Sequence, residues 1–410
     1  MNSTERVAEI QHFLEFIMMR WPQNREAVAA RLAPRCRRCI LSERYAPLVD
    51  GLCPACWQEE AGDDGGSGVA AGASGAVGEA GTPRAGAAEA LRDLLREYEG
   101  AASADSPAPA SAAASREYDA LLLFSGGKDS AFLLHRLRAE HPRLRLLAVT
   151  VDNGFFSSVA MANARRIVGR IGGVDHMVYR PRSELFVKTF RHAFTHLNEG
   201  GCYTTVDRMD GDLVFDIGRN LAAMLGVPLM IAGLSSEQVR RVLGLDHFES
   251  PRSRELARRE TSAGFDLQSL YTPEEQRYWW DGRRWGEGRV PRVVYPFFAW
   301  DYDEAAVREM VVELGLIEPG ADNPLITNND TIPVMVAVDI AKMGYCGFEP
   351  EFAELVRQGK ADRATWLAVF EAAEALVGEG RFLPHCIADT LTRLDLTEAD
   401  VGIPKLQLNG

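Results

Sequence analysis

The chain has 410 residues, 46% of them hydrophobic and 25% charged, and carries a formal net charge of −13 at pH 7. This length allows two or three domains with a sizeable core, and the acidic balance argues against a broad nucleic-acid-binding surface. No apolar run reaches the roughly 18 residues that a membrane helix needs, and the first residues, MNSTERVAEIQHFLEF, lack the apolar core of a signal peptide. We therefore expect a cytoplasmic protein that does not enter a membrane.

The N-terminal segment combines a helix with a cluster of cysteines. Apolar residues at helical spacing predict one amphipathic helix over 5–31, within an N-terminal segment 1–33. Two C-x-x-C pairs follow at 34–58. Four thiolates at this spacing can close a tetrahedral site, so the segment predicts a structural zinc ribbon, with an Fe–S cluster as the alternative. The predicted Zn²⁺ ligands are Cys36, Cys39, Cys53 and Cys56.

Residues 59–116 are predicted to be a flexible linker that holds one short helix at 85–99. The stretches on either side of this helix are built from Gly, Ala, Ser, Pro and Asp, which cannot bury enough apolar surface to order themselves. We therefore expect the ribbon to be a mobile docking module at the end of this linker.

From Tyr118 onward strands alternate with helices, so 117–236 is predicted to be one α/β domain. Such alternation implies a doubly wound, mostly parallel sheet with helices on both faces. The predicted strands are 120–124, 146–151, 176–179 and 227–232, and the predicted helices are 130–137, 157–171, 184–197 and 212–225. Ligands of these sheets bind at the carboxyl ends of the strands, where the segments SGGKDS, DNGFF and GLSSEQ lie.

The remainder is predicted to be an irregular insertion, 237–300, followed by a helical C-terminal region, 301–410. An arginine-rich run at 252–259 either binds an anionic substrate or forms a solvated helix face. The aromatic cluster of the insertion either shapes a sugar pocket or seals the insertion, and we favour the second; it consists of Tyr278, Trp279, Trp280 and Trp285. The predicted C-terminal helices are 303–315, 331–343, 349–358, 362–377 and 386–395.

The segment LLLFSGGKDS, 121–130, predicts a phosphate-binding loop after the first strand. Its two glycines let the backbone approach an anion, and the amide N–H groups and the dipole of the next helix favour negative charge there. Lys128 adds a full positive charge, and Asp129 fits if Mg²⁺ lies between it and the phosphates. The predicted loop residues are Ser125, Gly126, Gly127, Lys128, Asp129 and Ser130.

The motif SGGKDS in this strand–turn–helix context resembles the pyrophosphate loop of the PP-loop ATP pyrophosphatases. The resemblance implies that ATP is bound with Mg²⁺, that a substrate oxygen attacks the α-phosphate, and that a nitrogen or sulfur nucleophile then displaces AMP. It implies catalytic roles for Lys128, Asp129 and Ser130. At the ends of the neighbouring strands we expect nucleotide contacts from Asp152, Asn153, Gly154 and Gly233. For Asp152 the alternative is a capping role in the following turn.

Several further segments narrow the resemblance. The lead-in REYDALLLF, the segment VTVDNGFFSSVAMANARRI, the tetrapeptide GVDH, the pair Arg180–Pro181 and the N-terminal cysteine pairs together resemble the N-acetyl sugar amidotransferases. These enzymes turn a sugar acetamido group into an acetamidino group. The resemblance implies ammonia as the nucleophile, a small molecule such as a nucleotide sugar as substrate, and a separate glutaminase as partner.

Two alternatives stay open. Some tRNA thiolation enzymes share the ribbon and the loop, so the chain is alternatively a sulfurtransferase that acts on tRNA or a small metabolite. The acidic balance argues against tRNA, and Cys202 lacks a C-x-x-C partner because Thr205 stands three residues later. Cys202 is then best interpreted as a buried core thiol. The other alternative is a nucleotide-binding scaffold without turnover, which the intact Lys128 and Asp129 disfavour.

Overall fold

The computed structural model describes residues 1–61, 86–99, 116–300, 302–318 and 329–408. It divides into two compact units. The ribbon unit comprises Met1–Ala71, Glu184–Asp210 and Asn328–Gly410, and the sheet unit comprises Gly72–Ser183 and Gly211–Thr327. The predicted linker stretches lie largely outside the described residues, whereas the short helix between them is confirmed as α4 (Ala87–Tyr98).

The sheet unit is built on five parallel strands in the order β3-β2-β1-β4-β7. They are β1 (Ala120–Leu123), β2 (Leu146–Val151), β3 (Asp175–Tyr179), β4 (Leu229–Ile231) and β7 (Arg292–Val294). The inner strands β2 and β4 are buried along their whole length and β1 is buried except at its last residue, as expected for a parallel sheet covered on both faces. The predicted α/β class and the four predicted strands are thereby confirmed. The fifth strand, β7, lies inside the segment predicted to be irregular, and that part of the prediction is wrong.

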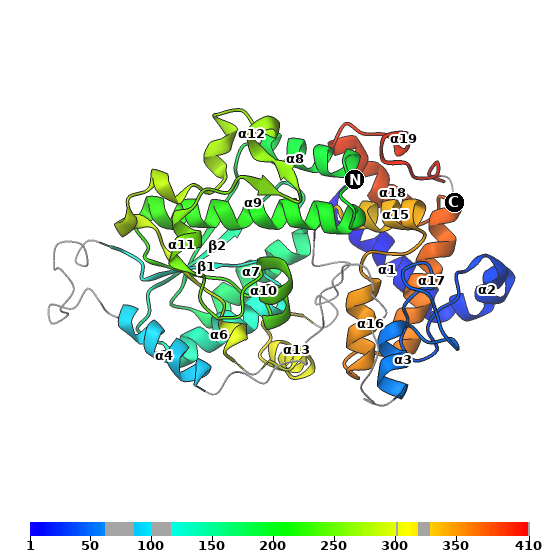
Figure 1. Cartoon of the computed structure of the whole chain (residues 1–410), viewed down its shortest axis with the longest axis horizontal. Helices are drawn as coiled ribbons and strands as arrows, with labels where there is room; N and C mark the ends of the chain where they lie inside the picture. Colours follow the sequence, from blue (N-terminus) through cyan, green and yellow to red (C-terminus); the bar gives the residue numbers. More distant parts are fainter. Residues whose placement is uncertain (62–85, 100–115, 301, 319–328, 409–410) are drawn as a thin grey trace. The chain divides into compact units, whose positions relative to one another are not determined.

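Helices cover the two faces of this sheet (Figure 1). Helices α6 (Lys128–Glu140) and α7 (Ser158–Ile171) lie on one side, and α9 (Gly201–Leu225) lies on the other. Helix α9 packs so closely on the sheet that a Cβ on Gly218 would come within 2.7 Å of a Leu123 methyl group. Helix α9 is longer than the predicted 212–225 and includes Cys202 in its first turn.

The order of the strands marks one point as special. Strand β1 pairs with β2 on one side and with β4 on the other, as the partners Leu146 and Leu229 of Ala120 show. The chain moves outward to β2 and β3 first and then returns to the far side of β1. Ligands of doubly wound sheets bind at the carboxyl end of such a switch point. In this chain that position belongs to the segment that follows β1.

The segment after β4 is ordered by buried contacts. It contains α10 (Ser236–Leu243), α11 (Arg252–Leu256), the hairpin β5 (Thr261–Ser262) and β6 (Phe265–Asp266), α12 (Leu267–Leu270), and the short helices η2 (Glu275–Tyr278), η3 (Gly282–Arg284), η4 (Glu287–Arg289) and η5 (Pro296–Phe298); α13 (Glu304–Glu313) follows. Tyr278, Trp279 and Trp280 are buried, and Trp285 packs against the cluster that contains Trp280, so the favoured sealing role is confirmed.

The arginine-rich run at 252–259 is partly a solvated helix face, since Arg252 and Ser253 are exposed, but its arginines also have protein partners, which disfavours the anion site. Arg252 and Arg254 donate to backbone carbonyls of Val290 and Leu243, at 2.7 and 2.6 Å. Arg259 donates to the buried Asp216 carboxylate of α9 at 2.6 Å. Arginine forms such contacts well because its planar guanidinium offers several donors in a fixed geometry. The run therefore fastens the insertion to the sheet unit.

The ribbon unit is helical. Its helices are α1 (Ser3–Met19), α2 (Trp21–Val28), η1 (Ala29–Arg31), α3 (Pro54–Ala61), α8 (Ser183–Thr195), the start of α9, α15 (Ile332–Met343), α16 (Glu349–Arg357), α17 (Arg363–Gly378), α18 (Pro384–Arg393) and α19 (Glu398–Val401). The single predicted helix 5–31 is wrong: it breaks at Arg20, and a second helix begins at Trp21 with Pro22 in its first turn. None of the described helices combines the length and the apolar character that a membrane crossing requires.

The cysteine ribbon belongs to the body of this unit. Arg35, whose side chain is 3% exposed, pairs with Glu349 at 2.9 Å and with Glu374 at 3.0 Å. Arg363 of α17 donates to the carbonyls of Cys39 and Cys36, at 2.7 and 2.9 Å. Breaking a buried ion pair of this kind is costly. The expectation of a mobile docking module is therefore wrong.

Candidate functional site

The loop after β1 has a backbone that only glycine permits. Gly126 has φ +71°, in the left-handed region, and a Cβ there would lie 2.3 Å from the carbonyl oxygen of Ala160 in α7. The loop is therefore pressed against α7 at Gly126, which is buried, so that no other residue fits this position. Gly127 then takes an extended conformation (φ −80°, ψ 168°) and precedes the first turn of α6 without a side-chain cap.

We expect Gly126→Ala to destabilise the sheet unit by about 1–3 kcal/mol, the usual cost of overpacking, and to weaken ligand binding at the loop. The matched control is Gly169→Ala in α7, where the new methyl group meets no atom within 4 Å. This control should be neutral or slightly stabilising, since alanine favours a helix. Urea unfolding of the two variants measures the difference, and equal stabilities would contradict the close packing.

The side chains that begin α6 form a hydrogen-bonded group with a residue beyond β7. The Lys128 ammonium lies 2.9 and 3.1 Å from the two Asp129 oxygens and 3.3 Å from the Tyr302 hydroxyl oxygen. The Tyr302 hydroxyl also donates to Asp129. The Lys128 side chain is 17% exposed and that of Asp129 is 43% exposed. The structure thus brings together two predicted residues and one that sequence analysis missed.

The two serines of the loop close it from within. The Ser130 hydroxyl donates to the Gly127 carbonyl at 2.9 Å and lies 3.3 Å from the Ser125 hydroxyl. The Gly127 N–H points to the Ser125 hydroxyl oxygen at 3.4 Å. Ser130 is buried. The serines therefore shape the loop, and a contact from them to phosphate stays a prediction.

The predicted residues after β2 form a turn. The Asp152 carboxylate accepts the Gly154 N–H at 2.9 Å and pairs with Arg180 at 2.6 Å. The Asn153 side chain accepts the Phe155 N–H at 2.8 Å, and Gly154 has φ +83°. The alternative interpretation of Asp152, a cap for the turn, is confirmed, and the expected nucleotide contact stays untested. The Arg180 partner was not predicted, although it comes from the Arg-Pro pair.

The end of β4 contributes packing and a cap. A Cβ on Gly233 would lie 3.2 Å from a Leu133 methyl group of α6, which is tighter than an ordinary contact. Ser235 accepts the Gln238 N–H at 3.1 Å, and the Gln238 side chain accepts the Ser235 N–H at 3.0 Å. This capping box starts α10. Gly233 therefore has a packing role here, whereas its proposed nucleotide contact is a prediction.

The four ribbon cysteines converge as predicted. All four are fully buried, and their sulfur atoms lie within 4.8 Å of one another. The Cys39 and Cys53 sulfurs are 3.7 Å apart. Tetrahedral Zn²⁺ with bonds of about 2.3 Å places neighbouring sulfurs about 3.8 Å apart, so the donor set fits this ion. The N–H groups of Leu41 and Cys53 point at the sulfurs of Cys39 and Cys36, both at 3.4 Å, which stabilises thiolates.

The electrostatics of the four-cysteine cluster also favour a bound cation. Burial raises the pKa of the Cys56 thiol to about 12, and hydrogen bonding with Cys53 together with burial raises the pKa of Cys39. Four buried thiolates without a cation would repel one another. A divalent metal reverses this balance, because a coordinating thiol loses its proton. The geometry supports a closed metal site and does not separate Zn²⁺ from an Fe–S cluster.

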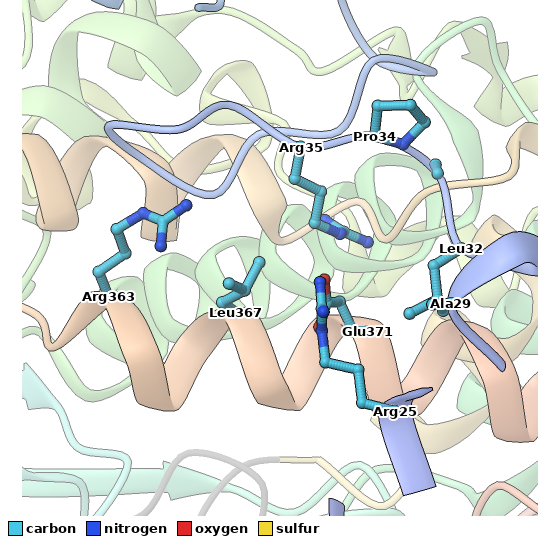
Figure 2. A pocket seen from close by; sticks show the side chains of 9 residues that line it. Arg25, Ala29, Leu32, Pro34, Arg35, Arg363, Leu367 and Glu371 are labelled. Atoms are coloured by element: carbon cyan, nitrogen blue, oxygen red, sulfur yellow. The ribbon is translucent and has the colours of Figure 1, made fainter. Parts of the chain in front are cut away.

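A small cavity lies beside the ribbon within the same unit. It has a volume of about 280 Å³, and Figure 2 shows the side chains that line it. Arg25 binds the Glu371 carboxylate through two hydrogen bonds of 2.6 and 2.8 Å. The guanidinium groups of Arg35 and Arg363 are occupied by the contacts described above. Since each guanidinium in the lining already has a protein partner, we assign no ligand to this cavity.

Cys202 is a core thiol, as favoured above. It is fully buried in the first turn of α9, and burial followed by the nearby Asp339 carboxylate raises its pKa well above the ordinary value. The Cys202 N–H donates to Asp339 at 2.5 Å and the Tyr203 N–H donates to it at 3.1 Å. Asp339 of α15 thus caps the N-terminus of α9. A neutral thiol in this position is a poor nucleophile.

The Asp339 carboxyl makes the ribbon unit sensitive to pH. Burial raises its pKa to about 6, although N–H groups of Cys202, Tyr203 and Gly347 oppose the rise. The folded state then holds this proton more tightly than the unfolded chain, whose aspartates have a pKa of about 3.9. The contribution of the Asp339 proton to the free energy of unfolding is fully present below about pH 4 and is lost as the pH rises through about 6. The total loss is at most about 3 kcal/mol. Asp339→Asn should flatten that decline in urea unfolding, and parallel wild-type and variant curves would contradict it.

No family model and no curated protein matches the chain. Among solved structures, the U34-tRNA thiolase NcsA from Methanococcus maripaludis, with its 4Fe-4S cluster, matches with a TM-score of 0.33 and 11% identity over 84% of this chain and 88% of that one. NMN synthetase from Francisella tularensis matches with a TM-score of 0.30 and 11% identity over 77% and 97%. Likeness at this level carries no conclusion about function.

Proposed function

We propose that the chain is an ATP-dependent adenylating enzyme of the PP-loop ATP pyrophosphatase type. The observation that supports it most is the loop at the switch point of the sheet: a glycine-only backbone is followed at once by Lys128 and Asp129 on the first turn of α6. A helix N-terminus, free of a side-chain cap and accompanied by an ammonium group, favours a polyphosphate. A scaffold that only binds nucleotide does not require an acidic residue beside that ammonium.

The proposed reaction has two steps. A carbonyl-type oxygen of the substrate attacks the α-phosphorus of ATP, and pyrophosphate leaves with the electron pair of the broken P–O bond. Ammonia then adds to the activated carbon and loses a proton to solvent, and AMP leaves with the electron pair of the C–O bond. Lys128 and the loop N–H groups would bind the pyrophosphate as its charge grows. Asp129 would hold Mg²⁺, which neutralises phosphate charge when it is bound.

For the finer function we propose an N-acetyl sugar amidotransferase. The support is the resemblance of the segments around the loop, with a nucleotide sugar as substrate and a separate glutaminase, or free ammonium, as nitrogen source. Sulfur transfer to tRNA or to a small metabolite is the alternative. The buried, neutral Cys202 disfavours a persulfide carrier at that position. An Fe–S cluster in the ribbon would favour the alternative.

The test is a nucleophile-swap assay. Purified protein is incubated with Mg-ATP, a panel of acetamido nucleotide sugars, and either ammonium or sulfide, and pyrophosphate release and product mass are measured. We expect release with ammonium and a product in which NH has replaced oxygen. Substrate labelled with heavy oxygen in its acetamido carbonyl should pass that label to AMP. Label found in phosphate instead would contradict adenylation.

The same assay separates the alternatives. Replacement of oxygen by sulfur, or turnover only with tRNA, would establish the sulfurtransferase. Nucleotide binding without pyrophosphate release under any of these conditions would indicate a scaffold. Tight, salt-sensitive binding of tRNA would further support the sulfurtransferase.

A further inference from the structure

We propose that Tyr302 is a positioning residue of the phosphate loop: its hydroxyl orients the Asp129 carboxylate and the Lys128 ammonium for a magnesium–pyrophosphate complex. The inference rests on the proposed function and names a residue that the loop motif does not contain. Tyr302 follows β7, the strand that the sequence pattern does not predict, and it is separated from the loop by more than 170 residues.

The contacts form a closed group. The Tyr302 hydroxyl donates to Asp129 Oδ1 and accepts from the Lys128 ammonium at 3.3 Å, while Lys128 lies 2.9 Å from the same Asp129 oxygen. One tyrosine oxygen therefore contacts both charged residues of the motif. Bonds to charged partners are the stronger class of hydrogen bond, because the charge polarises the donor or acceptor.

The tyrosine ring is held in place by the packing of its own segment. It lies 4.9 Å from the Phe297 ring and 6.4 Å from the Phe132 ring of α6, measured between centroids. Phe297 in turn stacks on Phe132 at 6.0 Å, and the Arg136 guanidinium lies 4.2 Å above the Trp300 ring. Such aromatic and cation–π contacts favour defined geometries. The segment after β7 thus packs on α6, and this packing places the Tyr302 hydroxyl at the phosphate loop.

The consequence for binding follows from the carboxylate geometry. With Oδ1 engaged by Tyr302, the Asp129 carboxylate is fixed in rotation, and its side chain is still 43% exposed toward solvent. A carboxylate that is already oriented loses less conformational freedom when it binds a metal–phosphate complex. Removing the hydroxyl should therefore weaken binding that depends on Mg²⁺ more than binding without the ion, because the Tyr302 contact to Lys128 is lost in both cases.

The test compares Tyr302→Phe with Tyr118→Phe. The first substitution removes only the hydroxyl and keeps the ring that packs on Phe297. The second removes a hydroxyl with the same chemistry, a 2.7 Å bond to Asp175, ahead of β1 at the other end of the strands. Titration calorimetry measures inorganic pyrophosphate binding by the full chain with Mg²⁺ and with chelator. We expect Tyr302→Phe to bind about tenfold more weakly with Mg²⁺, the effect of one hydrogen bond to a charged group, and Tyr118→Phe to match the wild type.

A double-mutant cycle then tests the coupling. If Tyr302 acts through Asp129, the substitution Tyr302→Phe should have no further effect in protein that already carries Asp129→Asn. Additive effects would overturn the proposal, as would an unchanged or tightened affinity in Tyr302→Phe alone, which would mark the contact as a lock on the ligand-free loop. Failure of the wild-type protein to bind pyrophosphate at all would instead overturn the proposed function, and the role of Tyr302 with it.

Discussion

Lys128→Ala should lower the rate of pyrophosphate release by about 10²- to 10³-fold, the usual effect of removing one group that stabilises charge in a transition state. The Lys128 side chain is largely buried, so its charge acts in a medium of lower dielectric than water. Its removal also leaves the Asp129 carboxylate without its ammonium partner next to the incoming phosphates. The repulsion adds to the lost attraction.

The matched control for this prediction is Lys360→Ala. Lys360 is exposed just after α16 in the ribbon unit, so the variant changes net charge equally without touching the loop. Steady-state pyrophosphate release with ammonium and the accepted substrate, followed for both variants, gives the comparison. Activity of Lys128→Ala within a few-fold of the wild type would remove the loop from the mechanism, whatever the fold.

Cys39→Ala should abolish metal binding and unfold the ribbon at temperatures where the wild type is folded. Structural Zn²⁺ supplies about 10–16 kcal/mol of apparent binding free energy to ribbons that fold around it, far more than the truncation of one buried side chain costs. The ribbon also carries Arg35, whose partners Glu349 and Glu374 would be left buried without their cation if the ribbon opened. Elemental analysis and thermal unfolding with and without chelator measure both effects.

Cys386→Ala is the control for the cysteine prediction. Cys386 is fully buried in α18 of the same unit but lies outside the four-sulfur cluster. Truncating Cys386 removes packing contacts but no metal ligand. We therefore expect full metal content and a modest loss of stability. Equal metal content in Cys39→Ala and wild type would show that the cluster is a set of core thiols. The metal analysis also decides between zinc and iron.

The features that sequence alone determined are local ones. The apolar runs of β1, β2 and β4 could be recognised because each is short, continuous and bounded by turn residues. The two cysteine pairs and the loop SGGKDS were equally visible, since metal ligation and anion binding each require particular residue types at fixed spacing. The parallel sheet followed from the alternation of strands and helices, and the structure confirms it.

The sequence-based prediction missed strand β7 and the helix break at Arg20 for opposite reasons. A strand of three residues, Arg292–Val294, is too short to show a period, and only pairing with β4 makes it a strand. Around Arg20 the helical pattern persists across the break, so periodicity cannot show where one helix ends. Strand β7 therefore depends on a partner that is distant in the sequence, whereas the break at Arg20 is local and coincides with Pro22 in the first turn of the second helix.

The features of the candidate site also fall into those set by the local sequence and those set by the tertiary structure. The sequence by itself determined which residues carry charge at the loop, because Lys128 and Asp129 are adjacent in the chain. Only the tertiary structure decided that Tyr302 joins them, that Arg180 pairs with Asp152, and that the ribbon is anchored by Arg35 and Arg363. The physical reason is that hydrogen bonds and ion pairs act over a few ångströms in space. Residues far apart in the chain meet only when the packing of strands and helices brings them within that range.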